Sequence, residues 1–392
     1  MHSFTQAEVS RICNVSRATV NRWVELSIEG KNNLQIDTST NKVRILDNPH
    51  NEAELKRLSA TASKYQGGEV KKVTLSDEFY KLFSFEEKIE IFNDLQYNSQ
   101  INLKYAYKNV GAEYWNKFYI NGVSKVIKFT DDILDICFED FLYYLPKNAK
   151  TNIVDIGPGN GYPAKDLLQK FSKADRLSKY LALDISEEIN NLTIKNIQKW
   201  FPGLKCLSYQ SDVEYGKVSN IFLENKEKNE SNLILHLGNT LCNYNDRLQV
   251  LKHLSFGITP DDLLVLTFTL NIPENKAEIN YAKNDNTGVK DWLPKLLGID
   301  IKNCEMVGEY NEKLNCKTAG FQLDKDYEIE FKLANRTEII HLKTGQVINT
   351  WKHYLVDIVH FIEEARAAKL EILDLKTDVA GTYALAICRF KN

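Results

Sequence analysis

Residues 152–171, NIVDIGPGNGYPAKDLLQKF, begin as an apolar run, pass through three glycines and continue with the spacing of a helix. Gly157, Gly159 and Gly161 therefore lie between an expected strand and an expected helix. A glycine turn at such a place lets the backbone approach a ligand where side chains would block it. Taken alone, this stretch is consistent both with a nucleotide-binding turn and with a plain tight bend.

Apolar runs of strand length recur after this stretch, with helix-length segments between them, which predicts βαβ units and a parallel sheet. Near the end of the chain, residues 370–377 and 383–390 form two more runs joined only by DVAGT. This connection is too short for a parallel crossover and predicts an antiparallel hairpin. A parallel sheet of five strands closed by such a hairpin resembles the class I S-adenosylmethionine-dependent methyltransferases. The five parallel strands are expected at residues 152–157, 180–186, 205–212, 232–239 and 262–270.

Polar groups suited to a nucleotide-like cofactor stand at the ends of the second and third expected strands. Asp184 closes the second strand and can accept hydrogen bonds from both hydroxyls of a ribose. Asp212 ends the third strand, where an acid can meet an adenine amino group, and Val213 can pack against the adenine ring. Together with the glycine turn, these residues predict an adenosine-containing cofactor.

The spacing of the glycines and of the acidic residue that follows them distinguishes a dinucleotide from S-adenosylmethionine. The glycines follow the pattern G-x-G-x-G, and Asp184 comes 27 positions after Gly157. Dinucleotide-binding enzymes instead show G-x-G-x-x-G with the acid about 20 residues on. The spacing and the terminal hairpin disfavour an NAD-dependent enzyme and favour S-adenosylmethionine.

Four further segments resemble, in order and approximate spacing, the histidine-specific N-alpha-methyltransferases of the ergothioneine pathway. The resemblance covers about residues 100–390 and rests on KYAYKNVGAEYW at 104–115, LGNTLCNY at 237–244, INYAKNDNTGV at 279–289 and GQVINT at 345–350. It implies an S-adenosylmethionine-dependent enzyme that methylates the amine of an amino acid. It also implies that residues before the first sheet strand join an insertion after the fifth strand to form a substrate domain.

The resemblance also implies roles for individual residues. Asn243 would meet the substrate, Tyr281 would lie near its carboxylate, and Tyr107 would lie close to the acceptor amine and steer its proton. The implied cofactor contacts, with those of the glycine turn, are Gly157, Gly159, Gly161, Lys165, Asp184, Asp212 and Val213.

The chain departs from that family just after GQVINT, where the family places Glu and, two residues later, Ser to grip the imidazole. This chain has Trp351 and His353 at those positions. Trp351 can narrow the pocket or stack on a flat substrate, or it can be a core residue outside the pocket. The substrate is therefore expected to be an amino acid or related small amine that binds an altered pocket.

The first 50 residues resemble the small winged helix-turn-helix domains of the excisionase and MerR type. Residues 4–26 carry two helix-spaced patterns around a tight turn, and residues 34–46 read as a β-hairpin. In those families the second helix enters the DNA major groove. DNA contacts would then come from Arg17, Thr19, Asn21 and Arg22. A protein-interaction or dimerisation module is the alternative.

Composition bounds the remaining possibilities. The chain has 392 residues, is 43% hydrophobic and carries a formal charge of −3, so no global basic field attracts it to nucleic acid. No secretory signal, membrane-spanning run or zinc spacing is visible, which predicts a cytoplasmic protein without a metal. The oligomeric state is left open by the sequence.

The expected architecture is a class I methyltransferase sheet with a substrate-domain insertion and an N-terminal winged helix-turn-helix domain. Its expected parts are residues 1–65 (winged domain), 71–150 (helical, part of the substrate domain), 151–270 (cofactor core), 271–350 (insertion) and 351–392 (terminal helix and hairpin). The expected function is an S-adenosylmethionine-dependent N-methyltransferase. A DNA-binding regulator whose methyltransferase-like domain senses S-adenosylmethionine or a metabolite is the alternative.

Overall fold

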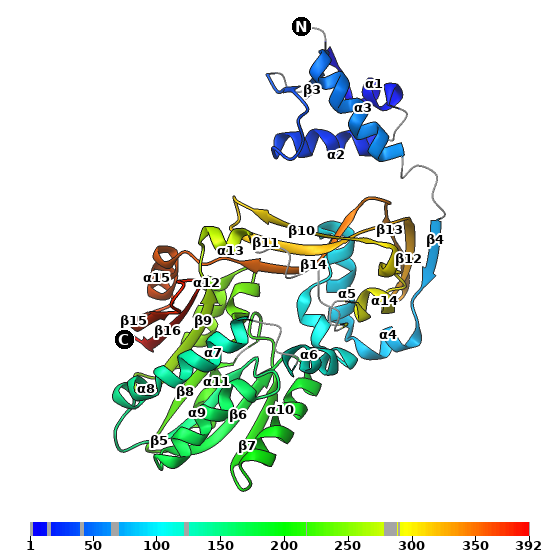
Figure 1. Ribbon diagram of the computed structural model, residues 1–392. Helices are drawn as coiled ribbons and strands as arrows, with labels where there is room; N and C mark the ends of the chain where they lie inside the picture. The colour runs from blue at the N-terminus through cyan, green and yellow to red at the C-terminus, as the bar shows by residue number, and fades with distance from the viewer. Residues whose placement is uncertain are drawn as a thin grey trace.

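The computed structural model describes residues 3–13, 17–39, 43–63, 70–120, 125–216, 218–277, 288 and 291–391. The chain forms an N-terminal part, a central seven-stranded sheet covered by helices, and a second α/β part beside one end of that sheet (Figure 1).

The N-terminal part builds a small core around Val20, Trp23 and Ile45. Its strands form a three-stranded sheet in the order β1-β3-β2, with both pairings antiparallel. α3 contributes Leu55 to this core and so belongs to this part of the chain. The elements are β1 (Ser3–Phe4), α1 (Gln6–Ile12), α2 (Arg17–Ile28), β2 (Ile36–Asp37), β3 (Arg44–Leu46) and α3 (Pro49–Ser63).

The central sheet confirms the predicted arrangement of five parallel strands and a terminal hairpin. Its order is β15-β16-β9-β8-β5-β6-β7, and β16 runs antiparallel to both β9 and β15. The strands are β5 (Lys150–Ile156), β6 (Leu177–Asp184), β7 (Lys205–Gln210), β8 (Glu230–His236), β9 (Leu263–Thr269), β15 (Leu370–Thr377) and β16 (Tyr383–Phe390).

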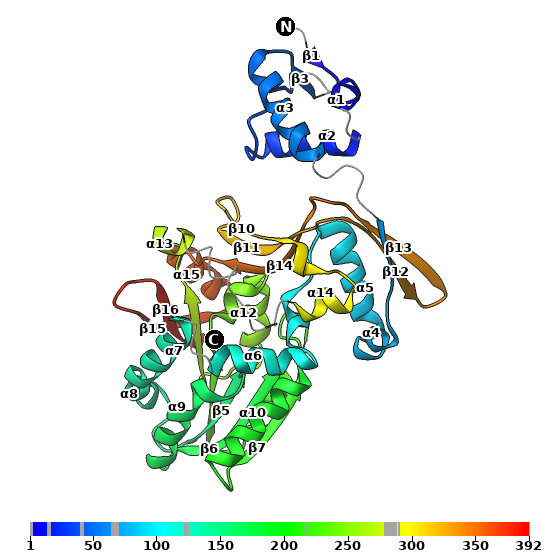
Figure 2. The same ribbon diagram turned by 45° about the vertical axis from the view of Figure 1, so that its right-hand side comes forward.

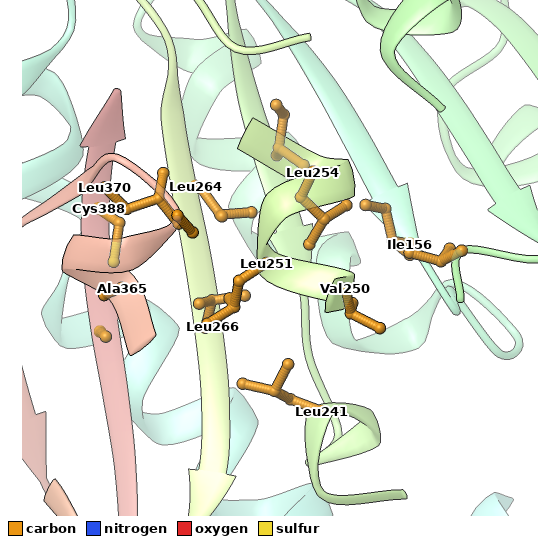
Figure 3. Close-up of a cluster of buried hydrophobic side chains, with 14 of the residues drawn as sticks. Ile156, Leu241, Val250, Leu251, Leu254, Leu264, Leu266, Ala365, Leu370 and Cys388 are labelled. Atoms are coloured by element: carbon orange, nitrogen blue, oxygen red, sulfur yellow. The ribbon is translucent and has the colours of Figure 1, made fainter. Parts of the chain in front are cut away.

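Helices cover both faces of this sheet because its central strands are apolar on both sides. Figure 3 shows one face, where Leu251 and Leu254 of α12 and Ala365 of α15 pack against Leu264 and Leu266 of β9. α11 packs on this same face, and α7, α8, α9 and α10 pack on the opposite one. The helices are α7 (Lys125–Ile136), α8 (Phe138–Tyr144), α9 (Tyr162–Lys173), α10 (Glu187–Trp200), α11 (Ser219–Glu224), α12 (Arg247–Ser255) and α15 (Ile358–Ala367).

The second part is built from two segments that are far apart in sequence, residues 70–120 and residues 273–354. Phe79 and Tyr105 from the first segment share one core with Trp292, Phe331 and Ile348 from the second. Along β12 (Asp326–Leu333), buried side chains alternate with partly or fully exposed ones. The elements are β4 (Val70–Thr74), α4 (Asp77–Leu82), α5 (Phe85–Asn93), η1 (Asp94–Asn98), η2 (Leu103–Tyr107), α6 (Val110–Ile120), α13 (Pro273–Ala277), α14 (Trp292–Leu296), η5 (Ile301–Asn303), β10 (Glu305–Asn311), β11 (Cys316–Gln322), β12 (Asp326–Leu333), β13 (Arg336–Leu342) and β14 (Val347–Tyr354).

Three details differ from the expected division of the chain. Residues 71–150 are not wholly helical, because β4 pairs in parallel with β12. Within the same range, α7 and α8 pack on the central sheet instead of the second part. The expected boundary at 350/351 falls inside β14, which continues to Tyr354 alongside β11.

Candidate active site

A cavity of about 330 Å³ lies where the second part meets the carboxyl ends of the central strands. In Figures 1 and 2 these two parts lie next to each other at that end of the sheet. Its lining includes the strand-end residues Gly157, Gly159, Asp184, Ser211, Asp212 and Val213. It also includes Tyr107, Trp115, Trp351 and His353 from the second part, and Asn243 from η3 (Thr240–Asn243), which follows β8. Residues distant in the sequence therefore line one cavity.

The three glycines of the turn after β5 have different environments. All adopt positive φ, at 66° for Gly157, 60° for Gly159 and 77° for Gly161. A Cβ on Gly159 would lie 2.2 Å from Cη2 of Trp115, so the absent side chain admits the indole. Gly161 does not line the cavity; it caps α9, and a Cβ there would meet Thr193 and Ile197 of α10 at 3.2 Å. The structure thus gives Gly161 a packing role, and its contact with the cofactor stays a prediction.

Two carboxyl groups line the cavity, that of Asp155 buried and that of Asp184 partly buried. Burial raises the pKa of Asp184 to about 7, although the backbone N–H of Ser186 donates to its carboxylate at 2.8 Å. Burial likewise raises the pKa of Asp155 to about 7, against a 2.8 Å hydrogen bond from the Tyr180 hydroxyl. Asp155 was not singled out from the sequence. The signal for Asp155 was a carboxyl group inside the otherwise apolar residues 153–156.

These pKa values predict how cofactor affinity depends on pH. A carboxylate must be ionised to accept two ribose hydroxyls, and below about pH 7 a proton competes for Asp184. We expect the affinity for S-adenosylhomocysteine to fall about tenfold per pH unit as pH drops below 7 and to level off above it. Calorimetric titrations between about pH 5.5 and 8 measure this, with circular dichroism checking the fold at each pH. A dissociation constant that stays level across this range would contradict the role of Asp184.

Asp212 forms an ion pair with a lysine that the sequence analysis did not identify as a site residue. Lys104 of η2 places its ammonium 3.2 Å from Asp212 and 2.8 Å from Glu90. Burial lowers the pKa of Lys104, but the hydrogen bond to Glu90 and the charge of Asp212 outweigh it, so the net shift is upward. The ion pair links the end of β7 to the second part at the expected adenine edge of the cavity.

The acceptor side of the cavity is shaped by an irregularity in β14. The register with β11 shifts between Ala319 and Gly320, which pair with Trp351 and Asn349, so Thr350 is left as the extra residue of a bulge. Bulges re-aim side chains, and Thr350, Trp351 and His353 all line the cavity. Trp351 is thus a wall residue, and its ring stacks on that of His353 at 5.2 Å between centroids and 12° between planes.

His353 is buried and hydrogen-bonded at both ring nitrogens. Its Nε2 lies 2.8 Å from the hydroxyl of Thr269, and its Nδ1 lies 3.3 Å from Oδ1 of Asn243. Burial and the nearby charge of Lys317 lower the pKa of His353 to about 3. The ring is therefore neutral at physiological pH and presents no charge to a substrate.

The remaining expected site residues fall into three groups. Tyr107, Asn243 and Val213 line the cavity, as expected. Lys165 does not; its ammonium lies 5.0 Å from the centre of the Trp200 ring on the outer side of α9, so its expected cofactor contact lacks support. Tyr281 lies outside the residues that the structure describes.

The residues expected to contact DNA lie on α2. Asn21 and Arg22 are exposed, Thr19 is half-buried, and Arg17 begins the helix. The guanidinium of Arg22 lies 3.2 Å from a carboxylate oxygen of Glu25 and 3.9 Å from one of Glu29. Its charge is thus partly balanced by Glu25 in the same helix and by Glu29 just after it.

Two kinds of feature are absent from the described residues. No helix in the described ranges is both long and apolar enough to cross a membrane. Nor do three or more His, Cys, Asp or Glu residues converge there in a way that can hold a metal ion.

Comparison with known proteins identifies relatives over most of the chain. The family model described as "Histidine-specific methyltransferase, SAM-dependent" matches residues 87–390. The protein named "Ergothioneine biosynthesis protein 1" from Neurospora crassa is 26% identical over 149 residues, which is 37% of this chain and 16% of that protein. The chain thus matches only a small part of the length of that curated relative.

Solved structures of methyltransferases also match. An S-adenosylmethionine-dependent methyltransferase from Clostridium acetobutylicum has a TM-score of 0.41 at 12% identity, covering 71% of this chain and 99% of that one. Magnesium protoporphyrin IX methyltransferase from Synechocystis, solved with bound S-adenosylhomocysteine, has a TM-score of 0.41 at 12% identity, covering 73% and 96%.

Proposed function

Because the chain belongs to the family of S-adenosylmethionine-dependent, histidine-specific methyltransferases, we propose that this methyltransferase modifies the amine nitrogen of an amino acid or related small amine. One observation supports this most strongly: a single cavity is lined by the glycine turn and Asp184 together with Tyr107 and Asn243. Such a cavity suits a cofactor and an amine acceptor side by side.

The cofactor side fits an adenosine-containing group. Asp184 can accept from both ribose hydroxyls, and Val213 with Ile185 offers apolar contact to a purine. Bound there, S-adenosylmethionine supplies a methyl group that its positive sulfur activates for attack by a nitrogen lone pair. We expect Gly157, where an added Cβ would meet only Thr240 at 3.7 Å or more, to let the backbone approach its amino-acid end.

The residues on the acceptor side have three tasks. They must hold the amine in line, keep it neutral and exclude water, and positioning alone contributes about 7 to 11 kcal/mol to lowering such a barrier. Tyr107 is our candidate for steering the proton away from the amine. Trp115, Phe118 and Tyr119 give the cavity aromatic walls that exclude water. Asn243 anchors the acceptor by a neutral hydrogen bond.

The β14 wall argues against strict selectivity for histidine. Trp351 and the neutral His353 form a flat, uncharged surface where an imidazole N–H would need an acceptor. Stacking on such a surface suits a planar side chain. We propose that the acceptor is an amino acid with an aromatic or otherwise flat side chain, and that histidine is one member of this class.

A labelling experiment tests the proposed function. Purified protein is incubated with methyl-labelled S-adenosylmethionine and a pool of amino acids and cell extract that includes histidine, and products are identified by mass spectrometry. We expect label on the amine of one or more amino acids. Labelled trimethylhistidine would show that histidine fits despite the altered wall, whereas measurable cofactor binding with no labelled amine would contradict the proposal.

For the N-terminal part, we propose a winged helix-turn-helix domain of the excisionase or MerR type. The order of two helices followed by the antiparallel pair β2 and β3 supports it. The pairing of Arg22 with two glutamates speaks against strong phosphate binding, so we favour tethering or dimerisation over a DNA-binding regulator. A gel shift that disappears in Arg17→Ala/Arg22→Ala would reverse this preference.

A further inference from the structure

Lys104 joins the second part of the chain to the expected adenine edge of the cavity. Its ammonium lies 3.2 Å from Oδ2 of Asp212, which follows β7, and 2.8 Å from a carboxylate oxygen of Glu90 in α5. The same ammonium lies 5.2 Å from the ring centre of Tyr105 and 5.1 Å from that of Tyr215. The side chain is 14% exposed, so these four partners surround most of it.

The backbone that carries Lys104 is also held in place. Lys104 belongs to η2, where its N–H donates to the side chain of Asn102 at 3.1 Å. The carbonyl of Ala106 accepts from the indole N–H of Trp292 at 2.9 Å, and Tyr105 is fully buried in the core of the second part. The position of the ammonium is therefore fixed relative to the second part.

The ion pair of Lys104 and Asp212 lies between two cavities. Both residues line the cavity of the candidate active site and also a second cavity of about 290 Å³ beside it. The second cavity is acidic, because its lining also includes Glu86, Glu87, Glu90, Ile185, Gln210, Ser211 and Tyr215. The ion pair thus separates the adenine edge from this acidic cavity.

The carboxylate of Asp212 is held at both of its oxygens. Oδ1 accepts from the backbone N–H of Glu214 at 3.0 Å, and Oδ2 accepts from the ammonium of Lys104. A backbone N–H and an ammonium can only donate, and an ionised carboxylate can only accept, so the direction of both bonds is fixed. Each oxygen has a second lone pair, which leaves one acceptor site per oxygen for a ligand.

An oriented acceptor at this edge distinguishes between purines. Adenine carries an amino group at its sixth position, and this group donates hydrogen bonds. Hypoxanthine carries an oxygen there, which a carboxylate repels. Asp212 can therefore favour adenine, provided that its carboxylate stays ionised and points into the site.

Lys104 supplies the charge that keeps this carboxylate in place. Burial and, next, the charge of Asp212 raise the pKa of Glu214, so these two acids are close enough to repel each other. Glu90 shares the same ammonium. In the described ranges no other cationic side chain forms an ion pair with Asp212 or Glu90. Without Lys104, the three carboxylates would face one another, and Asp212 would turn away or take up a proton.

We propose that Lys104 is a positioning residue of the cofactor site, which holds the Asp212 carboxylate toward the adenine amino group and so makes the enzyme select adenine over hypoxanthine. Lys104 acts through Asp212 in this scheme and does not itself touch the purine. The second part of the chain thereby completes the cofactor side of the cavity as well as the acceptor side. This inference rests on the proposed function, and in particular on the proposed place of the adenosine group.

Calorimetry with two ligands tests the inference. In S-inosylhomocysteine, an oxygen replaces the purine amino group of S-adenosylhomocysteine, and the ratio of the two dissociation constants measures selection for adenine. We expect the wild-type protein to favour the adenine ligand by about 10- to 100-fold, as one hydrogen bond to a charged group allows. Lys104→Met removes the ammonium but keeps a flexible unbranched side chain, and it should lose most of this ratio.

Lys108→Met is the matched control. Lys108 directly follows η2, is 11% exposed and forms an ion pair with Glu87 at 2.5 Å, but it lines neither cavity. This variant loses a similar ion pair from the same stretch of chain, and its ratio should equal that of the wild type. Lys104→Arg keeps the positive charge with a different donor geometry, so it should retain more of the ratio than Lys104→Met.

Asp212→Asn tests whether Lys104 acts through Asp212. An amide can turn either an oxygen or an amino group toward the purine, so this variant alone should lose the ratio. Adding Lys104→Met to Asp212→Asn should change the ratio no further, because residues that act as a unit are not additive. The melting temperature of each variant checks that its fold is retained.

The outcomes separate the inference from the function on which it rests. If the wild-type protein neither binds S-adenosylhomocysteine nor methylates an amine, the proposed function fails and the inference fails with it. If it methylates an amine but does not favour the adenine ligand, or if Lys104→Met keeps the ratio of the wild type, the role of Lys104 is refuted while the function stands. An equal loss in Lys108→Met, or a further loss in the double variant, would also refute it.

Discussion

Asp184→Ala is expected to abolish binding of S-adenosylmethionine, with a dissociation constant at least about a hundredfold higher than that of the wild type. The side chain closes β6, lines the cavity and is held in place by the backbone N–H of Ser186. Losing it would remove the two charge-assisted hydrogen bonds that we propose it makes to the ribose, each with a free energy of about 1.5 to 3 kcal/mol. Isothermal calorimetry with S-adenosylhomocysteine measures the loss directly.

Glu187→Ala is the matched control for this experiment. Glu187 is also acidic and lies three residues away, but it is exposed in the first turn of α10 and does not line the cavity. It should bind the cofactor as the wild type does. Near-normal affinity in Asp184→Ala would show that the cofactor lies elsewhere.

Gly159→Ala is expected to lower both stability and cofactor affinity. A side chain at φ 60° costs about 1 to 2 kcal/mol of unfolding free energy. In addition, the new Cβ would stand 2.2 Å from the indole of Trp115, so the ring must move out of a cavity wall. We expect a dissociation constant at least about tenfold higher and a lower melting temperature.

Gly203→Ala separates the two causes. Gly203 also has a positive φ, of 92°, but a Cβ added there would have no atom within 4 Å. This variant should show only the cost of backbone strain and keep its cofactor affinity. Trp115→Ala in the Gly159→Ala background should recover part of the lost stability. If the two glycine variants behave alike, contact with Trp115 is not the reason for a glycine at 159.

The central sheet was predictable because its signals are local. Strand-length apolar runs separated by helices, and a connection too short for a crossover, determine seven strands without reference to the rest of the chain. Asp184 and Asp212 were predictable for a related reason: the carboxyl ends of parallel strands meet at one edge, so a polar residue that ends a strand lies near the others.

The acceptor side was less predictable because it depends on contacts between distant segments. The pairing of β4 with β12 joins residues more than 250 positions apart, and no local sequence pattern predicts it. The bulge at Thr350 is a property of the pairing with β11, so the sequence alone could not decide whether Trp351 faces the cavity or the core. Lys104 begins one of the family-like segments, yet its partner Asp212 follows 108 positions later.

The glycine turn shows a different limit. From the sequence, all three glycines were expected to contact the cofactor. In the structure Gly157 and Gly159 line the cavity, whereas Gly161 packs against α10. Lys165 was assigned by family resemblance, and its side chain instead lies over Trp200. A family resemblance predicts which position in the chain corresponds to a known site residue. The direction in which that side chain points depends on the residues around it.

A crystal structure of the protein with S-adenosylhomocysteine and a methylated amino acid tests the central claim most directly. The account predicts the ribose hydroxyls at Asp184, the purine beside Val213, and the amino acid between Asn243 and the ring of Trp351. An adenosine group bound away from the ends of β5, β6 and β7, or an amino acid outside the β14 wall, would contradict it.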